Sequence, residues 1–135
     1  MRYLIDADSA IDHLTRHASL FLRIPDLAPH DLALSAITLI ELQTGVVGSA
    51  TPREAERELR RFLKLVTLVP TNRRVIDATA RLRADLLGRR RPIAHRAYDL
   101  IVAATAIEYR LTVVSSNERD YLDIVGLQLL NPRSG

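Results

Sequence analysis

The chain contains no cysteine, and this absence excludes three kinds of chemistry at once. There can be no disulfide framework, no zinc site built on cysteine and no thiol nucleophile. Long apolar runs are missing too, because none approaches the roughly 20 residues that a membrane-spanning helix requires. The first residues lead directly into Tyr3-Leu4-Ile5, without a basic stretch, an apolar core and a cleavage site. We therefore expect no signal peptide and a cytoplasmic location.

Lysine is nearly absent, because Lys64 is the only lysine among the 19 basic residues and all the others are arginine. Arginine presents a planar fork that suits phosphate, which favours a nucleic-acid partner. A GC-rich genome would give the same bias without such a partner, so composition leaves both explanations open. The length of 135 residues and the apolar fraction of 47% predict one globular domain, residues 1–135.

Short apolar stretches alternate with amphipathic ones, and this pattern predicts strands separated by helices. Such an alternation is typical of a parallel sheet covered on both faces, so we expect a three-layer α/β/α fold with a mainly parallel central sheet. The expected strands are Tyr3–Ile5, Ala33–Ser35, Leu65–Val69, Leu111–Val114 and Leu127–Leu130. Helices are expected around residues 11–21, 38–47, 52–64, 72–87 and 99–109, with a turn and short helix over 117–122.

Three helix starts carry capping signals. Thr38 with Glu41, and Thr51 with Glu54, have the spacing of a capping box, which satisfies the first backbone N–H groups of a helix. Asn72 can cap the long helix that follows it. The two helices with capping boxes carry many apolar residues, which predicts a homodimer unless these residues complete the monomer's own core: Leu39, Val46, Val47, Leu59, Phe62 and Leu63.

Acidic side chains follow several of the predicted strands. Parallel strands bring their carboxyl ends to one edge of a sheet, where function gathers in such folds. Carboxylates that converge there without lysines repel one another unless they hold a hard cation such as Mg²⁺ or Mn²⁺. Arg119 is the one arginine expected close to them. The residues expected at this edge are Asp6, Asp8, Glu41, Asp99, Asn117 and Asp120.

Each of these acids also has a purely structural explanation. Asp6 and Asp8 could cap the helix that follows them. Glu41 could simply complete its capping box, and Asp99 could be a first-turn acid that the helix dipole favours. The functional prediction therefore depends on their joint placement in the fold.

Four blocks of sequence carry the strongest pattern, and they follow one another along nearly the whole chain. They are residues 4–12 with Asp6, 36–42 with Glu41, 91–105 with Asp99, and 111–121 with Asn117 and Asp120. In their order and spacing these blocks resemble those of PIN-domain ribonucleases, and the ending Asn131-Pro132 is similar as well. Their pattern and the chain length most resemble the VapC toxins of bacterial toxin–antitoxin pairs.

This resemblance implies that Asp6 and Asp99 ligate Mg²⁺, or Mn²⁺ in its place, and that Glu41 completes the acidic pocket. It implies a metal-dependent endoribonuclease that cleaves structured RNA, namely tRNA or ribosomal RNA. It also implies a homodimer that a cognate VapB-type antitoxin inhibits. We predict that a segment of this antitoxin occupies a groove over the acidic pocket.

Two positions depart from the family pattern. Asn117 stands where an aspartate is common in the family. The fourth ligand of the acidic site is therefore either the side-chain carbonyl oxygen of Asn117 or the carboxylate of Asp120. The segment from Ala94 to Ala97 looks longer than the usual link into the third block, which could change how RNA enters.

The run Arg89, Arg90 and Arg91 is the best candidate for contacts to RNA phosphates near such a site, although such runs are often solvated loops. His13 and His17 share a helix face, as paired metal ligands do, but a solvated face explains them as well.

Two rival functions remain. Haloacid-dehalogenase-type phosphatases also begin with two aspartates after a first strand, but they need a lysine, and Lys64 is badly placed for that role. A PIN-like module that binds RNA or a partner without cutting stays possible because of Asn117.

Overall fold

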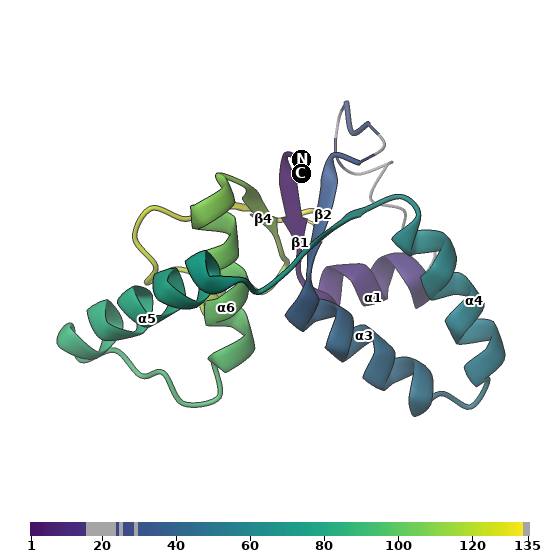
Figure 1. Ribbon diagram of the computed structural model, residues 1–135, viewed down its shortest axis with the longest axis horizontal. Helices are drawn as coiled ribbons and strands as arrows, with labels where there is room; N and C mark the ends of the chain where they lie inside the picture. The colour runs from purple at the N-terminus through teal and green to yellow at the C-terminus, as the bar shows by residue number, and fades with distance from the viewer. Residues whose placement is uncertain (16–23, 25, 29, 134–135) are drawn as a thin grey trace.

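The computed structural model describes residues 1–15, 24, 26–28 and 30–133, in which one sheet lies between two layers of helices (Figure 1). The sheet has five strands in the order β3-β2-β1-β4-β5, and every pair is parallel. The predicted three-layer α/β/α class is therefore confirmed, with a wholly parallel sheet. The strands are β1 (Tyr3–Ile5), β2 (Leu32–Ser35), β3 (Thr67–Val69), β4 (Thr112–Val114) and β5 (Gln128–Leu130).

The helices divide into two groups on opposite sides of the sheet, as Figure 1 shows. One group is α1 (Ala7–Thr15), α3 (Ala36–Val47) and α4 (Pro52–Leu63). The other group is α5 (Arg73–Gly88) and α6 (Ala97–Tyr109). A 3₁₀ turn, η1 (Glu118–Asp120), follows β4. In the described part of the chain, no helix has the length and apolar character to cross a membrane. The predicted continuation of the first helix to residue 21 lies outside the described residues.

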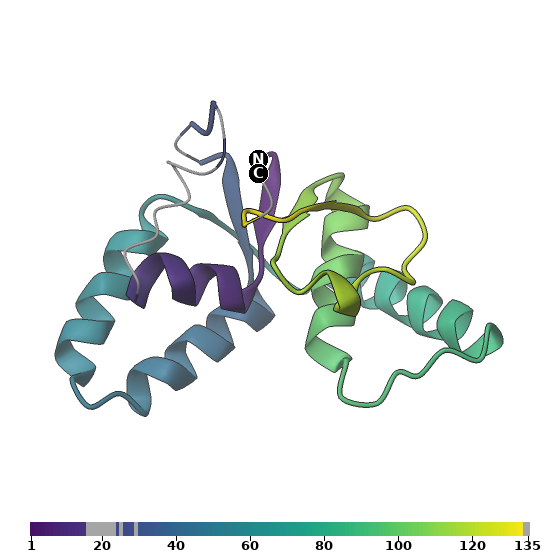
Figure 2. The same ribbon diagram turned by 180° about the vertical axis from the view of Figure 1, so that it is seen from behind.

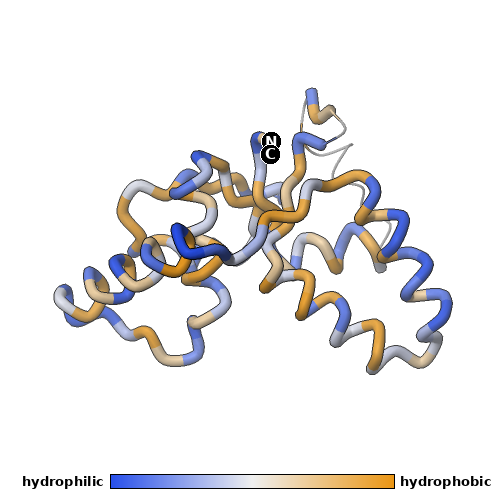
Figure 3. Tube along the Cα trace, viewed as in Figure 1, coloured by the Kyte–Doolittle hydropathy of each residue, from blue (hydrophilic) through white to orange (hydrophobic). Residues whose placement is uncertain are grey.

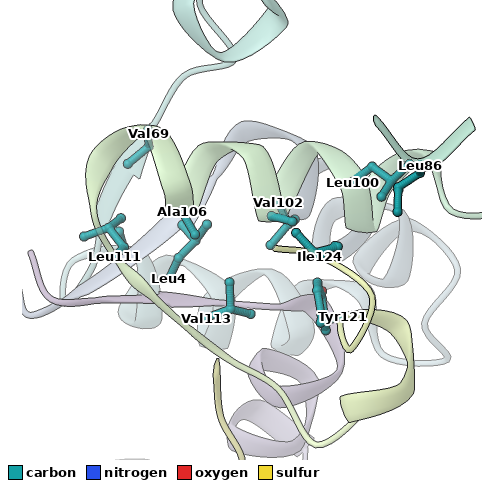
Figure 4. Packing of buried hydrophobic residues seen from close by; sticks show 12 residues of the cluster. Leu4, Val69, Leu86, Leu100, Val102, Ala106, Leu111, Val113, Tyr121 and Ile124 are labelled. Atoms are coloured by element: carbon teal, nitrogen blue, oxygen red, sulfur yellow. The ribbon is translucent and has the colours of Figure 1, made fainter. Parts of the chain in front are cut away.

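Neighbouring strand residues point to opposite layers, which gives the sheet two separate cores. Leu4 is completely buried in the core on the α5–α6 side, whereas Ile5 is completely buried in the core formed with α1, α3 and α4. Val113 and Val114 divide in the same way. Figure 4 shows the first core, in which Leu4 and Val113 pack near Tyr121 and the apolar face of α6. Both faces are covered, which explains why most strand residues are apolar.

The strand order reverses at β1. The chain proceeds from β1 to β2 and β3 on one side and then returns to β4 and β5 on the other. Seen from behind, the segment after β4 runs past α6 before it reaches β5 (Figure 2). The carboxyl ends of β1 and β4 therefore lie side by side, at the kind of switch point where α/β folds bind ligands.

The N-cap of helix α3 lies three residues earlier than the sequence predicts. This N-cap is Ser35, whose Oγ accepts a hydrogen bond from the backbone N–H of Ile37 at 3.2 Å. Thr38 is buried inside the helix, so the predicted capping box of Thr38 and Glu41 is wrong. The reason is that β2 runs directly into α3, which leaves the serine at the boundary. The structural explanation for Glu41 is thereby removed.

The other two predicted caps behave differently from each other. Among the described residues, the Thr51 side chain has no hydrogen bond that caps α4. Asn72 does cap α5, because its Oδ1 accepts from the backbone N–H of Val75 at 3.1 Å. Its Nδ2 also donates to the hydroxyl of Tyr109 at 2.8 Å, which ties α5 to α6.

The apolar residues that seemed too numerous for one core are mostly used within the monomer. Leu59 and Phe62 are each only 2% exposed, in the core with Ile5 and Leu34, as the alternative in which these residues complete the monomer's own core requires. Leu39, Val46 and Leu63 pack partly buried against the same core. The helix α4 is mostly hydrophilic along its length, as Figure 3 shows, and its buried residues are Leu59 and Phe62. Val47, in contrast, is 81% exposed.

The caps give a direct test of the fold. Asn72→Ala should lower the free energy of unfolding by about 1–2 kcal/mol, because it removes a cap and a second hydrogen bond. Thr51→Ala is the matched control and should change stability by less than about 0.5 kcal/mol. Urea unfolding followed by circular dichroism measures both values, and equal losses in the two variants would contradict the capping assignment.

Candidate active site

Asp6 is the first residue after β1 and the N-cap of α1. Its Oδ1 accepts a hydrogen bond from the backbone N–H of Ser9 at 2.9 Å, and the residue is only 6% exposed. Burial raises the pKa of its carboxyl group, and hydrogen bonds from the Ser115 side chain and the Ser9 backbone oppose that rise. The predicted structural role as a cap is therefore real, and it fixes the carboxylate at the switch point.

Asp99 lies in the first turn of α6. Its pKa is raised to about 6, first because the side chain is half-buried and then because Asp120, Asp6 and Asp8 repel its charge. The hydroxyl of Tyr121, 3.5 Å from Oδ1, acts in the opposite direction. Asp99 is thus close enough to Asp6 for each charge to influence the other, although 93 positions separate them in the sequence.

Glu41 approaches the same point from α3. Partial burial raises its pKa, and the charges of Asp99, Asp8 and Asp6 raise it further. The structure therefore brings Asp6, Glu41 and Asp99 into one acidic cluster, as the sequence predicts. Their catalytic role stays a prediction.

The two candidates for the fourth position lie on the same turn but make different contacts. Asn117 donates a hydrogen bond from Nδ2 to the carboxylate of Asp8, and its backbone N–H donates to Ser115 Oγ at 3.0 Å. Asp120, in η1, is close enough to Asp99 to raise its pKa. Asp120 therefore contributes charge to the cluster, whereas Asn117 holds Asp8.

A cavity of about 340 Å³ opens over this cluster between α3 and the start of α6. Glu41 and Asp99 form its acidic wall, and His95, Ala97 and Tyr98 line the remainder. The cavity has the size of a small-molecule site, and it places two carboxylates in contact with whatever enters.

Comparison with known proteins identifies the family. A model of the PIN domain matches residues 3–127. The chain belongs to the PIN domain family. It is 27% identical over 133 residues to Ribonuclease VapC2 of Rickettsia felis, covering 97% of this chain and 98% of that protein. The VapBC2 complex of Rickettsia felis, solved with a promoter DNA fragment, has a TM-score of 0.83 and 25% identity over 97% of this chain and 98% of that chain.

A second solved structure, the DNA-bound VapBC of Salmonella typhimurium, has a TM-score of 0.88 at 22% identity and covers 98% of each chain, which supports the fold. The predicted recognition, a PIN domain of the VapC type, is confirmed. The predicted class of enzyme, a nuclease, is confirmed with it.

The acidic cluster of this PIN domain suits a hard divalent cation by its chemistry. Among the described residues, no three Asp, Glu or His side chains lie close enough together to enclose one metal ion. Mg²⁺ does not need such an enclosure, because it usually keeps several waters and takes one or two carboxylates together with a substrate phosphate. Burial, and then mutual repulsion, raises the pKa of Asp99 and Glu41, and a bound cation would relieve this repulsion.

The arginines predicted to hold RNA make contacts within the PIN domain instead of pointing freely to solvent. Arg89 pairs with Asp85 at 2.7 Å and donates to the carbonyl of Asp123 at 2.7 Å. Arg91 pairs with the carboxylate of Asp123 at 3.1 Å. Arg90 lies between them with a left-handed backbone, φ 58°. Two members of the run therefore fasten the loop, and their contact to RNA stays a prediction.

Sequence reasoning missed Arg96, an arginine that lies close to the cluster. The expectation that only Arg119 would be close is wrong, because Asp120 and Asp99 both act on the charge of Arg96. Its guanidinium binds the carboxylate of Asp123 through two nitrogens, at 2.6 and 2.9 Å. This pairing lowers the pKa of Asp123 to about 2. The sequence could have indicated this residue, because Arg96 stands only three positions before Asp99.

The histidine pair proposed from the sequence has a simpler explanation. The ring of His13 packs against that of Phe62, with centroids 5.3 Å apart, and burial lowers its pKa. His17 lies outside the described residues, so the pair itself is untested.

The raised pKa of Asp99 predicts a sign for a stability change. Asp99 binds its proton more tightly in the folded chain than in the unfolded chain, where the pKa of this carboxyl group is near 3.8. The free energy of unfolding therefore falls as the pH rises from about 4 to about 6. Above that range the charge costs on the order of 1–3 kcal/mol. Asp99→Asn should therefore stabilise the metal-free protein at neutral pH, and the gain should vanish below about pH 4.

Denaturant unfolding in chelator at several pH values measures this difference. Asp77→Asn, an exposed acid of α5, is the control and should show no comparable gain. Adding Mg²⁺ should then stabilise the parent more than the Asp99→Asn variant. A loss of stability in chelator, with an equal response to Mg²⁺, would make Asp99 a structural residue.

Proposed function

We propose that this chain is a metal-dependent endoribonuclease, the toxin of a toxin–antitoxin pair, which cleaves structured RNA such as tRNA or ribosomal RNA. The observation that carries the proposal is the convergence of Asp6, Glu41 and Asp99 from three separate elements on one acidic cluster, two of whose members, Glu41 and Asp99, line a cavity. The name of the relative, Ribonuclease VapC2, supports the reaction class.

In this proposal Asp6 and Asp99 hold the metal ion and Glu41 completes the pocket. Mg²⁺ or Mn²⁺, when bound, polarises the phosphodiester and promotes ionisation of the attacking water. Burial, and then the charges of the neighbouring carboxylates, raise the pKa of Glu41, which favours this carboxylate as a proton acceptor. Asp120 adds charge beside Asp99. Asn117 orients Asp8 through its amide group.

The rival phosphatase function receives no support from the fold. Lys64 is the C-cap residue of α4 and lies three residues before the start of β3, which places it on the amino side of the parallel sheet. The acidic cluster lies at the carboxyl edge. A module that binds RNA without cutting it remains the alternative, and a cleavage assay separates the two.

Asp6→Asn and Asp99→Asn should each abolish cleavage of total RNA by the purified protein in millimolar Mg²⁺. A loss of at least about a hundredfold is expected, since each change removes a carboxylate that positions the metal. Asp77→Asn should cleave like the parent, and chelator should silence all variants. RNA that stays intact with the parent, in Mg²⁺ and in Mn²⁺, would favour the non-cleaving alternative. Full activity in both site variants would refute the assigned site.

The inhibitory partner in this proposal is a cognate antitoxin of the VapB type. An apolar groove of about 450 Å³ lies between α1, α3 and α4 and is lined by Ile11, Leu14, Leu42 and Val46, among others. Glu54 and Glu58 stand on its wall, which suits an apolar segment that carries basic residues. Glu41 directly precedes Leu42 on α3, so an arginine of a segment in this groove could reach the acidic cavity.

The same proposal includes a homodimer formed through the outer face of α3. Leu39, Ile40 and Val47 line a shallow apolar surface there with Ala36, Gln43 and Thr44. Ile40 is 52% exposed and Val47 81% exposed, which is unfavourable for large apolar side chains on a monomer. A second copy of the chain would remove this surface from water.

The variant with both Ile40→Arg and Val47→Arg should be monomeric, because like charges would meet across the interface. Light scattering at micromolar concentration should give twice the chain mass for the parent and once for this variant. Leu122→Arg, at a residue 74% exposed after η1, is the control and should leave the mass unchanged. A parent of single mass would contradict the dimer.

A further inference from the structure

Two side chains that are not acidic line the cavity above the carboxylates. Tyr98 is 46% exposed, and His95 is exposed as well. Both share the cavity wall with Glu41 and Asp99. An aromatic ring and an imidazole are therefore presented to whatever molecule the carboxylates act upon.

The segment that carries them is held in place by the Arg96 side chain. Its guanidinium donates to the carbonyl of Pro92 at 2.8 Å, to the carbonyl of Asp120 at 3.2 Å and to both carboxylate oxygens of Asp123. The side chains of Arg96 and Asp123 are only 14% and 10% exposed. These contacts join Arg96 to Pro92 within the loop and attach the loop to Asp120 of η1.

The backbone of His95 adopts a left-handed conformation, with φ 63°. This region costs a residue with a side chain about 1 kcal/mol or more, and it persists only where the surroundings enforce it. The contacts of the next residue, Arg96, provide that enforcement. They hold the backbone that carries His95 beside the cavity that this residue lines. A strained residue at the edge of a catalytic cavity is a candidate for contact with substrate.

We propose that His95 and Tyr98 form a subsite for one unpaired nucleotide of the RNA, adjacent to the phosphate that the acidic cluster attacks. The base stacks on the ring of Tyr98, and the imidazole N–H of His95 donates a hydrogen bond to the neighbouring phosphate. Aromatic stacking is how proteins commonly bind splayed bases of single-stranded RNA, and paired bases cannot take part. The inference rests on the proposed function, and it selects loops and single strands over duplex RNA.

Short single-stranded RNAs that carry a fluorescent adenine analogue test this subsite. Binding is measured in Ca²⁺ by fluorescence quenching, which reports stacking, and cleavage is measured separately in Mg²⁺. Tyr98→Ala should weaken binding about tenfold and abolish the quenching, since one stacked base is worth about 1–3 kcal/mol. In the cleavage assay the loss should appear as a raised KM. Tyr98→Phe should bind like the parent.

Two controls separate a subsite from a change in the fold. Ile107→Ala alters a similarly exposed residue at the other end of α6 and should leave binding unchanged. His95→Asn removes the imidazole but tolerates the left-handed backbone, and it should weaken binding roughly twofold to tenfold. Unfolding curves of Tyr98→Ala should match those of the parent, because the ring is largely exposed.

The outcomes distinguish this inference from the proposed function. If the parent cleaves RNA and Tyr98→Ala keeps the parent's KM and quenching, the subsite is refuted while the nuclease stands. If quenching depends on Tyr98 but no variant cleaves, the subsite stands and the nuclease fails. An equal loss of binding for fully duplex RNA would also refute the subsite.

Discussion

The carboxylate of Asp6 accepts a hydrogen bond from the backbone N–H of Ser9 while almost no part of the residue is exposed to solvent. The backbone N–H of Asp6 in turn donates to the carbonyl of Val114 at 3.1 Å, which joins the end of β1 to β4. One residue thus caps α1, extends the sheet ladder and places a charge at the switch point. A carboxylate held at so many points cannot turn away from Asp99 and Glu41, so the cluster persists although its members repel one another.

That repulsion has to be balanced elsewhere in the fold. Two carboxylates about 5 Å apart repel by roughly 3 kcal/mol at an effective dielectric near 20. The helix that carries Asp99 offsets this cost by its burial, since Leu100, Val102 and Ala106 of α6 are at most 2% exposed in one core. The charge stays unfavourable where it stands. A cation, or a basic side chain from a partner, would bind here with the added advantage of relieving that repulsion.

The sequence alone could predict which acids converge, because this depends only on strand ends meeting at one edge of a parallel sheet. It could not predict where each helix begins, since Ser35 and Thr38 are equally suitable caps until the end of β2 is known. It also could not predict which apolar residues of α4 belong to the core. Leu59 and Phe62 are buried because of the way the helix is oriented about its own axis. The role of Arg96 was hidden for another reason, because Asp123 follows it by 27 positions and only the loop path brings them together.

The abundant arginine of this chain takes on a different meaning once its contacts are known. Several arginines form ion pairs with carboxylates on the surface, namely Arg60, Arg61, Arg73 and Arg74. Such pairs contribute little to stability, but they partly neutralise the positive charge that would bind RNA phosphates. Arg89, Arg91 and Arg96 all converge on Asp123. The composition therefore overstates the charge available for phosphate contacts beside the cavity. In the proposed function, recognition of RNA at the cavity would depend more on shape and stacking than on a basic patch, and this is the chemistry that Tyr98 and His95 can supply.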